Sequence, residues 1–426
     1  MKHGQGWKPG KVETTQRSRG SAILIFFYPQ FKKLTGAERL ILRLADYTVR
    51  RSGHEVAVLT HSFADECRPA LGEGVRLIET GWRIRLTGNH YLDAAIEYLA
   101  GPALALRLPL RRVDGVVFFG GPSVPAMWFT RRVVLPLAGG RGHVPLLYFC
   151  FEPPRVLYSD TADIVRRLGL PGKLLLPAFY LYRALDRRMV RSAHRILANS
   201  PFGAQRIRDA YRRRAVVIEH GVDFDAPAPH DVQSLKQRYG LGGRAVAVTV
   251  NHLHPRKRID LFLRAVRHAS RLVPGTTALV VGGGPERGPL EQLARQLGMV
   301  VGRDVVFTGA VPEEELPAHY ALGSVYVHTG REESFGLSVI EALRLGLPVV
   351  SVDEGGPRHT VQNGVSGYLV PAEPEALGEA IARLLADPQR ARQMGQAGAG
   401  FVARRFRWER GADTLLSVLR QTASRL

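Results

Sequence analysis

The chain has 426 residues, 45% of them hydrophobic, and a mean hydropathy of −0.07, values typical of a globular protein. This length allows two domains of ordinary size, each with its own core. The apolar run at 21–28 ends at Pro29 and is too short to span a bilayer. It follows a basic stretch, as in a signal peptide, but no small-residue cleavage site precedes Lys32 and Lys33, so we predict that it is the first strand.

The only cysteines, Cys67 and Cys150, lie far apart in the chain. Such a pair indicates neither a disulfide framework nor a metal-binding spacing. We therefore expect a reducing compartment and a cytoplasmic protein.

The formal net charge is +21, from 59 Lys and Arg against 38 Asp and Glu. A positive field of this kind attracts nucleic acids, anionic lipid surfaces and phosphorylated small molecules alike, and an Arg-rich composition without functional meaning is the alternative. We favour an anionic membrane surface, because basic pairs alternate with apolar residues, as at 106–112. No aromatic-rich basic motif of a nucleic-acid-binding module occurs, so we expect no nucleic-acid partner.

The first half of the chain alternates apolar runs with helical patterns, as a parallel sheet with crossover helices does. Residues 1–20 are polar and basic and predict a disordered tail. Helices are expected at 36–50 and 180–191, and the segment 61–110 shows no clear pattern. Strands are expected at 22–28, 53–60, 115–119, 145–149 and 195–198.

The same alternation begins again after Asp223, and the Pro-rich stretch 226–229 between the two cycles is typical of a linker. We therefore predict an α/β fold of two doubly wound, Rossmann-like parallel-sheet domains, 21–225 and 226–400, facing a central cleft. Strands are expected at 245–250, 278–281, 305–307, 325–328 and 345–351. Helices are expected at 259–272, at 289–297 and from Phe335 or Gly336 onward.

Two carboxylates, Glu333 and Glu341, stand on either side of that last helix start. The free N–H groups and the dipole of a helix N-terminus favour a phosphate. Eight residues span at most ~12 Å of helix. A sugar joined through a diphosphate to a ribose has about that reach, so one carboxylate could accept from sugar hydroxyls and the other from ribose hydroxyls. On spacing alone, a solvated loop carboxylate and a surface Glu remain the alternative, but the strand before Glu333 favours a ligand site.

Three further motifs follow predicted strands. Gly36 opens the first helix, where a missing Cβ lets backbone N–H groups approach a phosphate, although a plain loop glycine fits equally well. The run 282–284 lacks the third spaced glycine of the dinucleotide fingerprint, so we predict no NAD binding. Arg256, Lys257 and Arg258 could neutralise a leaving diphosphate, the alternative being a solvated basic helix start.

Asp223 and Asp225 have the Asp-x-Asp form with which metal-dependent sugar transferases hold a divalent ion. The pair lies at the expected domain junction and not at the end of a strand in the cleft. We therefore predict no metal site there.

Taken together, these residues resemble glycosyltransferase family 4, a group of GT-B enzymes that includes bacterial lipopolysaccharide and dolichol-pathway mannosyltransferases. The likeness spans roughly residues 21–415, and the ordered set of motifs is far more specific than any single one. The motifs lie at 36–39, 51–56, 198–200, 220–223, 254–257, 333–341, 355–357 and 363–370.

The resemblance implies a GT-B fold whose C-terminal domain holds most of the donor nucleotide and whose N-terminal domain holds the acceptor. It also implies that the segment 401–426 returns as a helix to the N-terminal domain. In the donor site, Lys257 and Arg256 would contact the diphosphate, Glu333 the transferred sugar and Glu341 the ribose. The remaining donor-site residues would be Gly36, Phe335, Gly336 and Leu337, the last three through backbone N–H groups.

Enzymes of this family are similar in retaining the anomeric configuration without a metal. Their proposed mechanism is a front-face attack in which a donor phosphate oxygen takes the acceptor proton. The resemblance therefore implies no metal, no other cofactor and no protein general base. Glu333 and Lys257 would be catalytic because they stabilise charge in the transition state.

Three residues depart from the family pattern. His252 stands where an Arg is usual, so one diphosphate cation is absent or is replaced by Arg256 or Arg258. Phe151 occupies the place of a His that contacts the sugar in many members, and a phenyl ring cannot form that hydrogen bond. Glu152 and Arg155 are then the candidate acceptor-side contacts. His359 stands where a Glu is common.

We predict a retaining glycosyltransferase that moves a hexose from a GDP- or UDP-sugar to a glycan or lipid-linked acceptor. Mannose is the first candidate for this hexose. It would work at the inner face of the cytoplasmic membrane as a peripheral protein. The alternative is a non-catalytic nucleotide- or carbohydrate-binding protein that kept the GT-B fold, suggested by Phe151 and His252.

Overall fold

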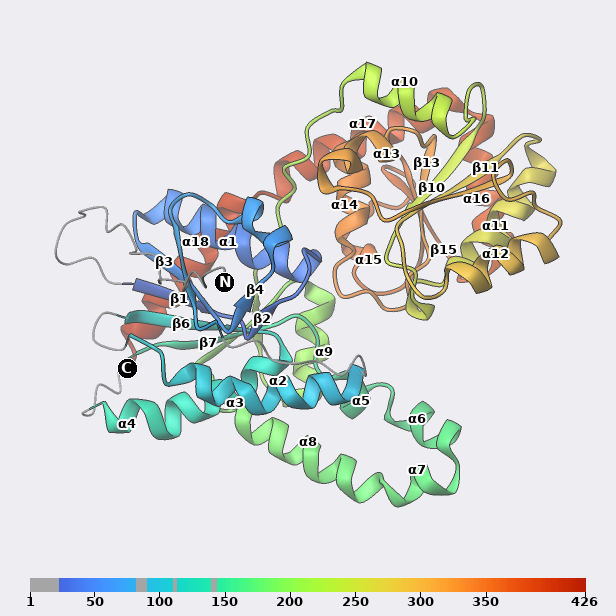
Figure 1. Ribbon diagram of the computed structural model, residues 1–426. Coiled ribbons are helices and arrows are strands. Elements are labelled where there is room, and N and C mark those ends of the chain that lie inside the picture. Colours follow the sequence, from blue (N-terminus) through green and yellow to red (C-terminus); the bar gives the residue numbers. More distant parts are fainter. Residues whose placement is uncertain (1–22, 82–89, 110–112, 139–143) are drawn as a thin grey trace, which may run out of the picture.

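The computed structural model describes residues 23–81, 90–109, 113–138 and 144–426 (Figure 1). The tail expected at 1–20 lies outside these residues. The described chain folds into two α/β domains, and the last helix packs on the first domain. The predicted class of two facing Rossmann-like domains is therefore confirmed.

The N-terminal domain is built on a seven-stranded sheet in the order β5-β3-β1-β6-β7-β8-β9, and all its pairings are parallel. The chain moves from β1 outward to β5 and then crosses back to β6, so the direction of winding switches between β1 and β6. The strands are β1 (Ile23–Phe27), β3 (Glu55–Thr60), β5 (Val75–Glu79), β6 (Val113–Phe119), β7 (Leu146–Cys150), β8 (Arg195–Ala198) and β9 (Ala215–Val217). A separate parallel pair joins β2 (Gln30–Phe31) to β4 (Ser62–Phe63).

Alternate residues of β1 enter two separate cores, as the pleat requires. Leu24 and Phe26 pack towards α1 (Gly36–Ser52) and α18 (Trp408–Ala423), whereas Ile25 and Phe27 pack towards α2, α3 and α9. Because both faces are covered, the strand is a continuous apolar run. The other helices of this domain are α2 (His90–Ala105), α3 (Val124–Phe129), α4 (Leu135–Leu137), α5 (Arg155–Tyr158), α6 (Thr161–Leu168), α7 (Leu170–Leu174), α8 (Leu176–Val190) and α9 (Pro201–Tyr211).

The C-terminal domain repeats this plan with six parallel strands in the order β12-β11-β10-β13-β14-β15. Its winding switches between β10 and β13, where Ala247 pairs with Val325 and Val248 with Tyr326. The strands are β10 (Val246–Val250), β11 (Thr277–Val281), β12 (Val305–Gly309), β13 (Val325–His328), β14 (Val349–Val352) and β15 (Gly367–Val370).

Helices cover both faces of the second sheet as well. One core packs β10 and β11 against α11 (Ile259–Leu272), α12 (Arg287–Gln296) and α16 (Pro374–Ala386). The opposite core packs the same strands against α10 (Pro229–Arg238), α13 (Leu316–Tyr320) and α14 (Leu337–Arg344). The short α15 (Pro357–Thr360) and the long α17 (Pro388–Arg405) complete the domain.

The chain returns to the N-terminal domain through α18, which packs along α1. Trp408 at its start lies so close to Gly221 that a Cβ there would be 2.4 Å from the indole ring, and Arg51 forms a bidentate pair with Asp413. The boundary expected at residue 401 falls inside α17, which ends at Arg405. In the described part of the chain, no helix has both the length and the hydropathy to span a bilayer.

Candidate active site

A cleft of about 840 Å³ lies between the two domains at the carboxyl ends of both sheets. Its walls come from the loops after β1, β7 and β8 on one side and after β10, β11, β12 and β13 on the other. These loops flank the switch points of both sheets, where ligands of open α/β sheets bind. Of the predicted donor residues, the cleft is lined by Gly36, Arg256, Lys257, Glu333, Phe335, Gly336, Leu337 and Glu341.

Glu333 follows β13 and forms an ion pair with Lys257, whose Nζ lies 2.6 Å from Glu333 Oε2. Lys257 sits in the loop after β10, so the pair joins two loops next to the switch point. Burial by itself would raise the pKa of Glu333, but Lys257, together with His328 and Arg256, holds that pKa below its ordinary value. Glu333 is therefore ionised at neutral pH and beside a cation that an incoming diphosphate could share.

The Glu333 loop is held in place by the turn at Gly355 and Gly356. Gly356 N–H donates a 2.7 Å hydrogen bond to Glu333 C=O. A Cβ on Gly356 would lie 2.5 Å from the Phe335 carbonyl oxygen, and Gly355 has φ +63°. Side chains are thus excluded at both positions, which explains why two glycines stand next to Pro357 in this motif.

The start of α14 is open towards the cleft. Its N-cap is Gly336 with φ +81°, and no described residue accepts a hydrogen bond from the N–H of Gly336, Leu337 or Ser338. The Phe335 side chain is buried and stacks on His220 with a ring-centroid distance of 4.3 Å. This fixed turn presents unsatisfied N–H groups and a positive helix end to the cleft, which is the arrangement that binds a phosphate.

Glu341 lies one turn into α14 and is 5% exposed. One carboxylate oxygen accepts from Arg39 Nη1 at 3.0 Å, and the other accepts from Tyr320 OH at 2.7 Å. Burial raises the pKa of Glu341 above its ordinary value, although Arg39 and Tyr320 oppose this shift. Each oxygen retains a lone pair, so the carboxylate can still accept from a ligand hydroxyl.

The three consecutive cations after β10 point to three different partners. Lys257 pairs with Glu333, and Arg256 reaches Glu152 of the other domain at 3.5 Å. Arg258 has φ +47°, forms a bidentate pair with Glu354 at 3.1 and 3.0 Å, and does not line the cleft. Of the two expected substitutes for the cation absent at His252, only Arg256 faces the cleft.

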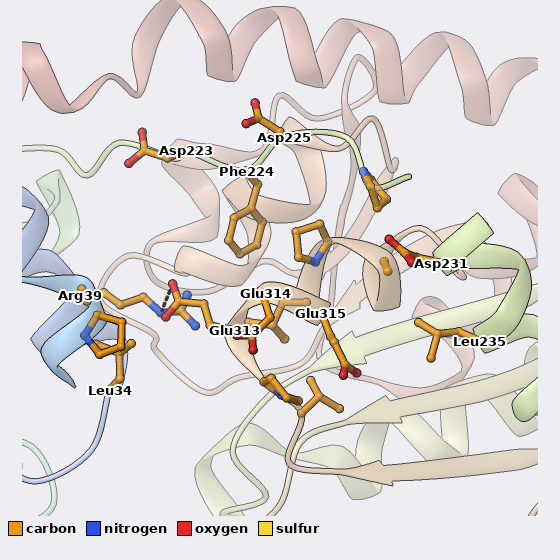
Figure 2. A pocket seen from close by; sticks show the side chains of 18 of the residues that line it. Leu34, Arg39, Asp223, Phe224, Asp225, Asp231, Leu235, Glu313, Glu314 and Glu315 are labelled. Atoms are coloured by element: carbon orange, nitrogen blue, oxygen red, sulfur yellow. Dashed lines mark ion pairs between the residues drawn. The ribbon is translucent and has the colours of Figure 1, made fainter. Parts of the chain in front are cut away.

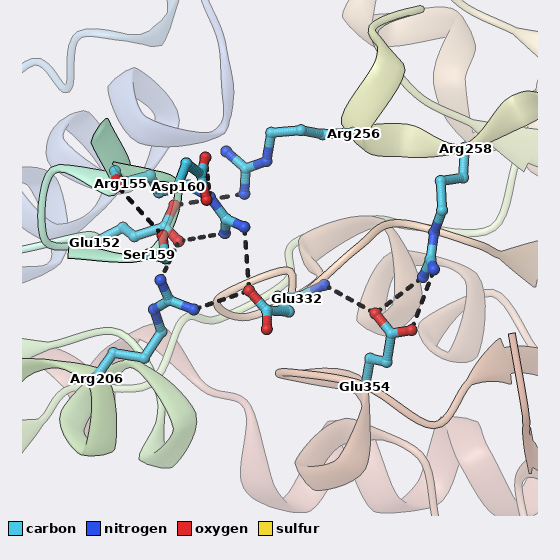
Figure 3. A network of polar contacts seen from close by, with 9 residues as sticks. All are labelled: Glu152, Arg155, Ser159, Asp160, Arg206, Arg256, Arg258, Glu332 and Glu354. Carbon is cyan, nitrogen blue, oxygen red and sulfur yellow. Dashed lines mark hydrogen bonds and ion pairs between the residues drawn. The ribbon is translucent and has the colours of Figure 1, made fainter. Parts of the chain in front are cut away.

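A network of charges crosses between the domains beside the cleft (Figure 3). Glu332 accepts from Arg155 Nη2 at 3.1 Å and from Arg206 Nη1 at 3.0 Å, although both arginines belong to the N-terminal domain. Arg155 also donates to Glu152 at 2.8 Å and to Asp160 at 3.2 Å, so its guanidinium is fully engaged and 11% exposed. Of the two expected acceptor-side residues, Glu152 lines the cleft, whereas Arg155 supports the network behind it.

A second cleft of about 1130 Å³ opens on the other side of Arg39 (Figure 2). Acidic residues of the junction and of the loop after β12 line it, including Asp223, Asp225, Glu313 and Glu314. Asp223 accepts from Tyr47 OH at 3.2 Å and lies 3.6 Å from Arg43. One member of the Asp-x-Asp pair is therefore already engaged by the N-terminal domain.

Sequence reasoning did not single out several side chains of the site. Arg39, Arg206, His220 and Tyr320 each contact a candidate site residue or motif from elsewhere in the fold. Arg39 did carry a signal, because it lies one helical turn after Gly36 and must face the same side of α1. His220 belongs to the motif at 220–223, but the resemblance gave it no role. Arg206 and Tyr320 have no local signal, since only the tertiary fold brings them to the cleft.

The fold and the cleft define the class of the protein: two Rossmann-like domains that close on a nucleotide-sugar-sized cleft with an anion-binding helix end and a carboxylate–lysine pair. Protein-family models agree with this class. Residues 34–226 match the Glycosyltransferase Family 4 model, and residues 231–401 match the model named Glycosyl transferases group 1.

Two curated relatives are named GDP-mannose-dependent alpha-(1-6)-phosphatidylinositol monomannoside mannosyltransferase. The one from Mycobacterium tuberculosis (strain CDC 1551 / Oshkosh) is 37% identical over 334 residues, which are 76% of this chain and 80% of the relative. The one from Mycolicibacterium smegmatis is 38% identical over 244 residues, which are 54% of this chain and 63% of the relative. The solved structure of Anabaena HepE in complex with UDP and glucose has a TM-score of 0.68 at 19% identity, covering 94% of this chain and all of that one.

The chain therefore belongs to the GT-B glycosyltransferases that combine a family 4 domain with a group 1 domain. The family predicted from the sequence motifs is confirmed, and with it the class of enzyme. The resemblance to HepE bears on the fold alone.

Proposed function

We propose that this glycosyltransferase moves mannose from GDP-mannose to a lipid-linked acceptor and retains the anomeric configuration. The names of the two mycobacterial relatives support GDP-mannose as the donor and the lipid character of the acceptor. The observation that carries the proposal is the Lys257–Glu333 pair beside the open N-terminus of α14. There, a cation and free N–H groups can hold a diphosphate while a carboxylate faces the sugar.

In this proposal the diphosphate binds the N–H groups of Gly336 and Leu337 and shares Lys257 with Glu333. Glu333 then accepts from the sugar hydroxyls, and Glu341 accepts from the ribose through the lone pairs that Arg39 and Tyr320 leave free. Arg256 supplies a second cation from the same loop. The guanine has no assigned partner in this proposal.

The bond changes need no protein group to gain or lose a proton. The bond between the anomeric carbon and the donor phosphate oxygen breaks, and the acceptor oxygen bonds to that carbon on the same face. The acceptor proton passes to the departing phosphate oxygen, which leaves in GDP. Lys257 and the α14 N–H groups stabilise the charge of the leaving group, the role that a divalent metal has in other transferases, so we propose a metal-independent reaction.

The acceptor would enter from the N-terminal side of the cleft, past Phe151 and Glu152. Glu152 remains the candidate hydrogen-bond partner for an acceptor hydroxyl. Arg155 acts through it, because Arg155 donates to Glu152 and not into the cleft. The site of action would be the inner face of the cytoplasmic membrane, where a lipid-linked acceptor can be reached.

The experiment is a thermal-stability screen with GDP, UDP, ADP and their sugar conjugates, with and without EDTA. A ligand at a hundred times its dissociation constant stabilises the fold by ~2.7 kcal/mol. We expect GDP and GDP-mannose to raise the Tm, and we expect EDTA not to change this shift. A Tm shift with UDP alone would overturn GDP-mannose as the donor. A Tm shift that EDTA abolishes would overturn the metal-free mechanism.

A further inference from the structure

The N-terminal domain carries an arm whose outer side is apolar. The arm consists of α7 and the first part of α8, residues 170–185, and Figure 1 shows it extending away from the sheet. Its large exposed side chains are Leu170 (70% exposed), Leu174 (74%), Leu175 (46%), Tyr180 (62%), Leu181 (63%), Tyr182 (37%) and Leu185 (47%). Half of the exposed large hydrophobic residues of the described chain thus lie in these sixteen positions.

The exposed leucines follow helical spacing and do not face the core. Leu174 ends α7, and Leu181 and Leu185 lie in α8. Hydrogen bonds from Leu175 N–H to Pro171 C=O and from Phe179 N–H to Leu175 C=O carry the helical register across the junction. The spacing of seven and then four positions, with Ala178 exposed between the first two leucines, therefore places them on one stripe. The opposite side of α8 packs inward, where Asp186 and Val190 are buried. A surface helix normally turns its polar side outward, and here the outward side is the apolar one.

The surroundings of this stripe are basic. Residues 161–191 contain seven Lys or Arg and two Asp, with no Glu. Lys173, Arg188 and Arg191 are exposed, whereas Asp186 is buried and Asp163 pairs with Arg166 at 3.3 Å. An apolar stripe with a basic border is the combination that binds an anionic lipid surface, and it would repel another strongly basic partner. A second copy of this chain, with its net charge of +21, is such a partner.

The arm is joined through α6 to the acceptor side of the cleft. α5 begins with Arg155, which contacts Glu152 and Glu332, and α6 and the arm follow directly along the chain. A bilayer that held the arm would therefore hold the domain to which the proposed function assigns the lipid-linked acceptor.

We propose that the α7–α8 arm docks this enzyme on anionic bilayers by inserting Leu174, Leu181 and Leu185 at the level of the lipid headgroups. Lys173, just before Leu174, and Arg188, just after Leu185, contact lipid phosphates at the two ends of this stripe. The docking itself stands independently of the reaction, and only its link to acceptor delivery rests on the proposed function.

The test is co-sedimentation of the full chain with vesicles of phosphatidylcholine alone and of phosphatidylcholine with an equal amount of phosphatidylglycerol. We expect binding to the anionic vesicles, and we expect Leu174→Asp and Leu181→Asp each to weaken it about tenfold or more. Lys173→Glu combined with Arg188→Glu should also weaken it. Matched controls on α11 of the other domain are Leu272→Asp, at a residue 55% exposed, and Arg264→Glu with Arg271→Glu, which should leave binding unchanged.

A second measurement does not depend on loss of binding. Cys67 and Cys150 are buried, so an environment-sensitive dye on Leu174→Cys would label one place. Its emission should shift to shorter wavelength with anionic vesicles, whereas dye on Leu272→Cys should not respond. The same variants should keep their GDP-induced thermal shift, which separates a failure of docking from a failure of the proposed function.

Four outcomes would overturn the proposal. They are unchanged vesicle binding in the arm variants, an equal loss in the α11 controls, equal binding to uncharged vesicles, and a dimer that Leu174→Asp dissociates in the absence of lipid. The last result would show that the stripe serves self-association.

Discussion

Arg39 and Glu341 lie 302 positions apart in the chain and in different domains, yet the guanidinium of Arg39 donates a 3.0 Å hydrogen bond to the Glu341 carboxylate. The pair joins the first helix of the N-terminal domain to the helix whose N-terminus is the candidate phosphate site. Arg39 also lies 3.2 Å from Glu313. Closure of the two domains is thereby coupled to the charge of the carboxylate assigned to the ribose.

We predict that Arg39→Ala weakens GDP binding about tenfold to a hundredfold, the value of a hydrogen bond to a charged group. Without Arg39 the buried Glu341 loses its cation, its pKa rises further, and it becomes a poorer acceptor for ribose hydroxyls. Calorimetric titration with GDP measures the change. The control is Arg43→Ala on the same helix. The Arg43 side chain is 42% exposed and pairs with Asp223, so its loss should change GDP binding little. Equal losses in both variants would contradict a specific role for Arg39.

A second prediction concerns Glu333. Glu333→Gln keeps the shape of the side chain but removes the charge that pairs with Lys257. We expect mannosyl transfer to fall about a hundredfold or more, the effect of removing one preorganised electrostatic contact in a transition state. GDP binding should persist or tighten, because Lys257 is released for the diphosphate. Transfer and GDP affinity are measured on the same variant, and Glu314→Gln, in the second cleft, is the control.

Transfer at the wild-type rate by Glu333→Gln would remove Glu333 from the mechanism. A parallel loss of GDP binding would instead indicate that the variant loop has moved.

The fold followed from the sequence wherever local pattern decides structure. The strands covered on both faces, such as Ile23–Phe27 and Val246–Val250, are short and mostly apolar runs followed by loop residues, as buried parallel strands are. The short β9 and the helices α5 to α7 were not predicted, because segments of three to eight residues carry too little periodicity. The segment 61–110, which showed no clear pattern, contains β4, β5 and the whole of α2.

The candidate site divides in the same way. Lys257, Glu333 and the turn at Gly336 could be identified because they follow strands and precede helices within short motifs. The partners Arg206 and Tyr320 could not, since nothing near them in the sequence indicates the residues that they meet across the fold. Arg155 was predicted to contact the acceptor, and its three ion pairs were not foreseen. Nothing near Arg155 in the sequence indicates the partner that it meets in the other domain.

The turn behind Glu333 gives a third prediction. Gly356→Ala places a Cβ 2.5 Å from the Phe335 carbonyl oxygen, and both are backbone positions that cannot rotate away. We expect displacement of the 333–336 loop, a lower Tm and a loss of the GDP-induced shift. Gly288→Ala, in α12, is the control, because a Cβ there meets nothing within 4 Å and a helical alanine should stabilise. An unchanged GDP response in Gly356→Ala would show that the loop tolerates the shift.

A fourth prediction concerns Glu332, which holds φ +47° while it bridges Arg155 and Arg206. Glu332→Ala keeps this unfavourable backbone and removes both links, whereas Glu332→Gly removes the links and relieves the backbone by about 1 kcal/mol. We expect a larger radius of gyration by solution scattering in both variants and a lower Tm for the alanine variant than for the glycine variant. The surface pair of Asp163 with Arg166 supplies the control, Asp163→Ala. Unchanged radii would mean that other contacts hold the domains closed.

The last prediction concerns pH and Asp186, which is fully buried in α8 and accepts a 2.9 Å hydrogen bond from Tyr158 OH. Burial raises the pKa of Asp186 from 3.8 to about 6, although Tyr158, Tyr211 and Arg187 oppose this shift. The native state therefore binds the proton more tightly than the unfolded state, so this group makes the fold less stable as pH rises from 3.8 to about 6. Above that range the ionised Asp186 lowers the free energy of unfolding by its full amount, up to about 3 kcal/mol.

Asp186→Asn cannot ionise, so we expect it to raise the free energy of unfolding at pH 8 by more than it does at pH 4.5. Chemical denaturation of both proteins at the two pH values measures this difference. The control is Asp209→Asn on the exposed side of α9, which should show no such dependence. An Asp186→Asn effect that is the same at both pH values would mean that the residue matters through packing and its hydrogen bond alone, and that the carboxyl titrates in its ordinary range.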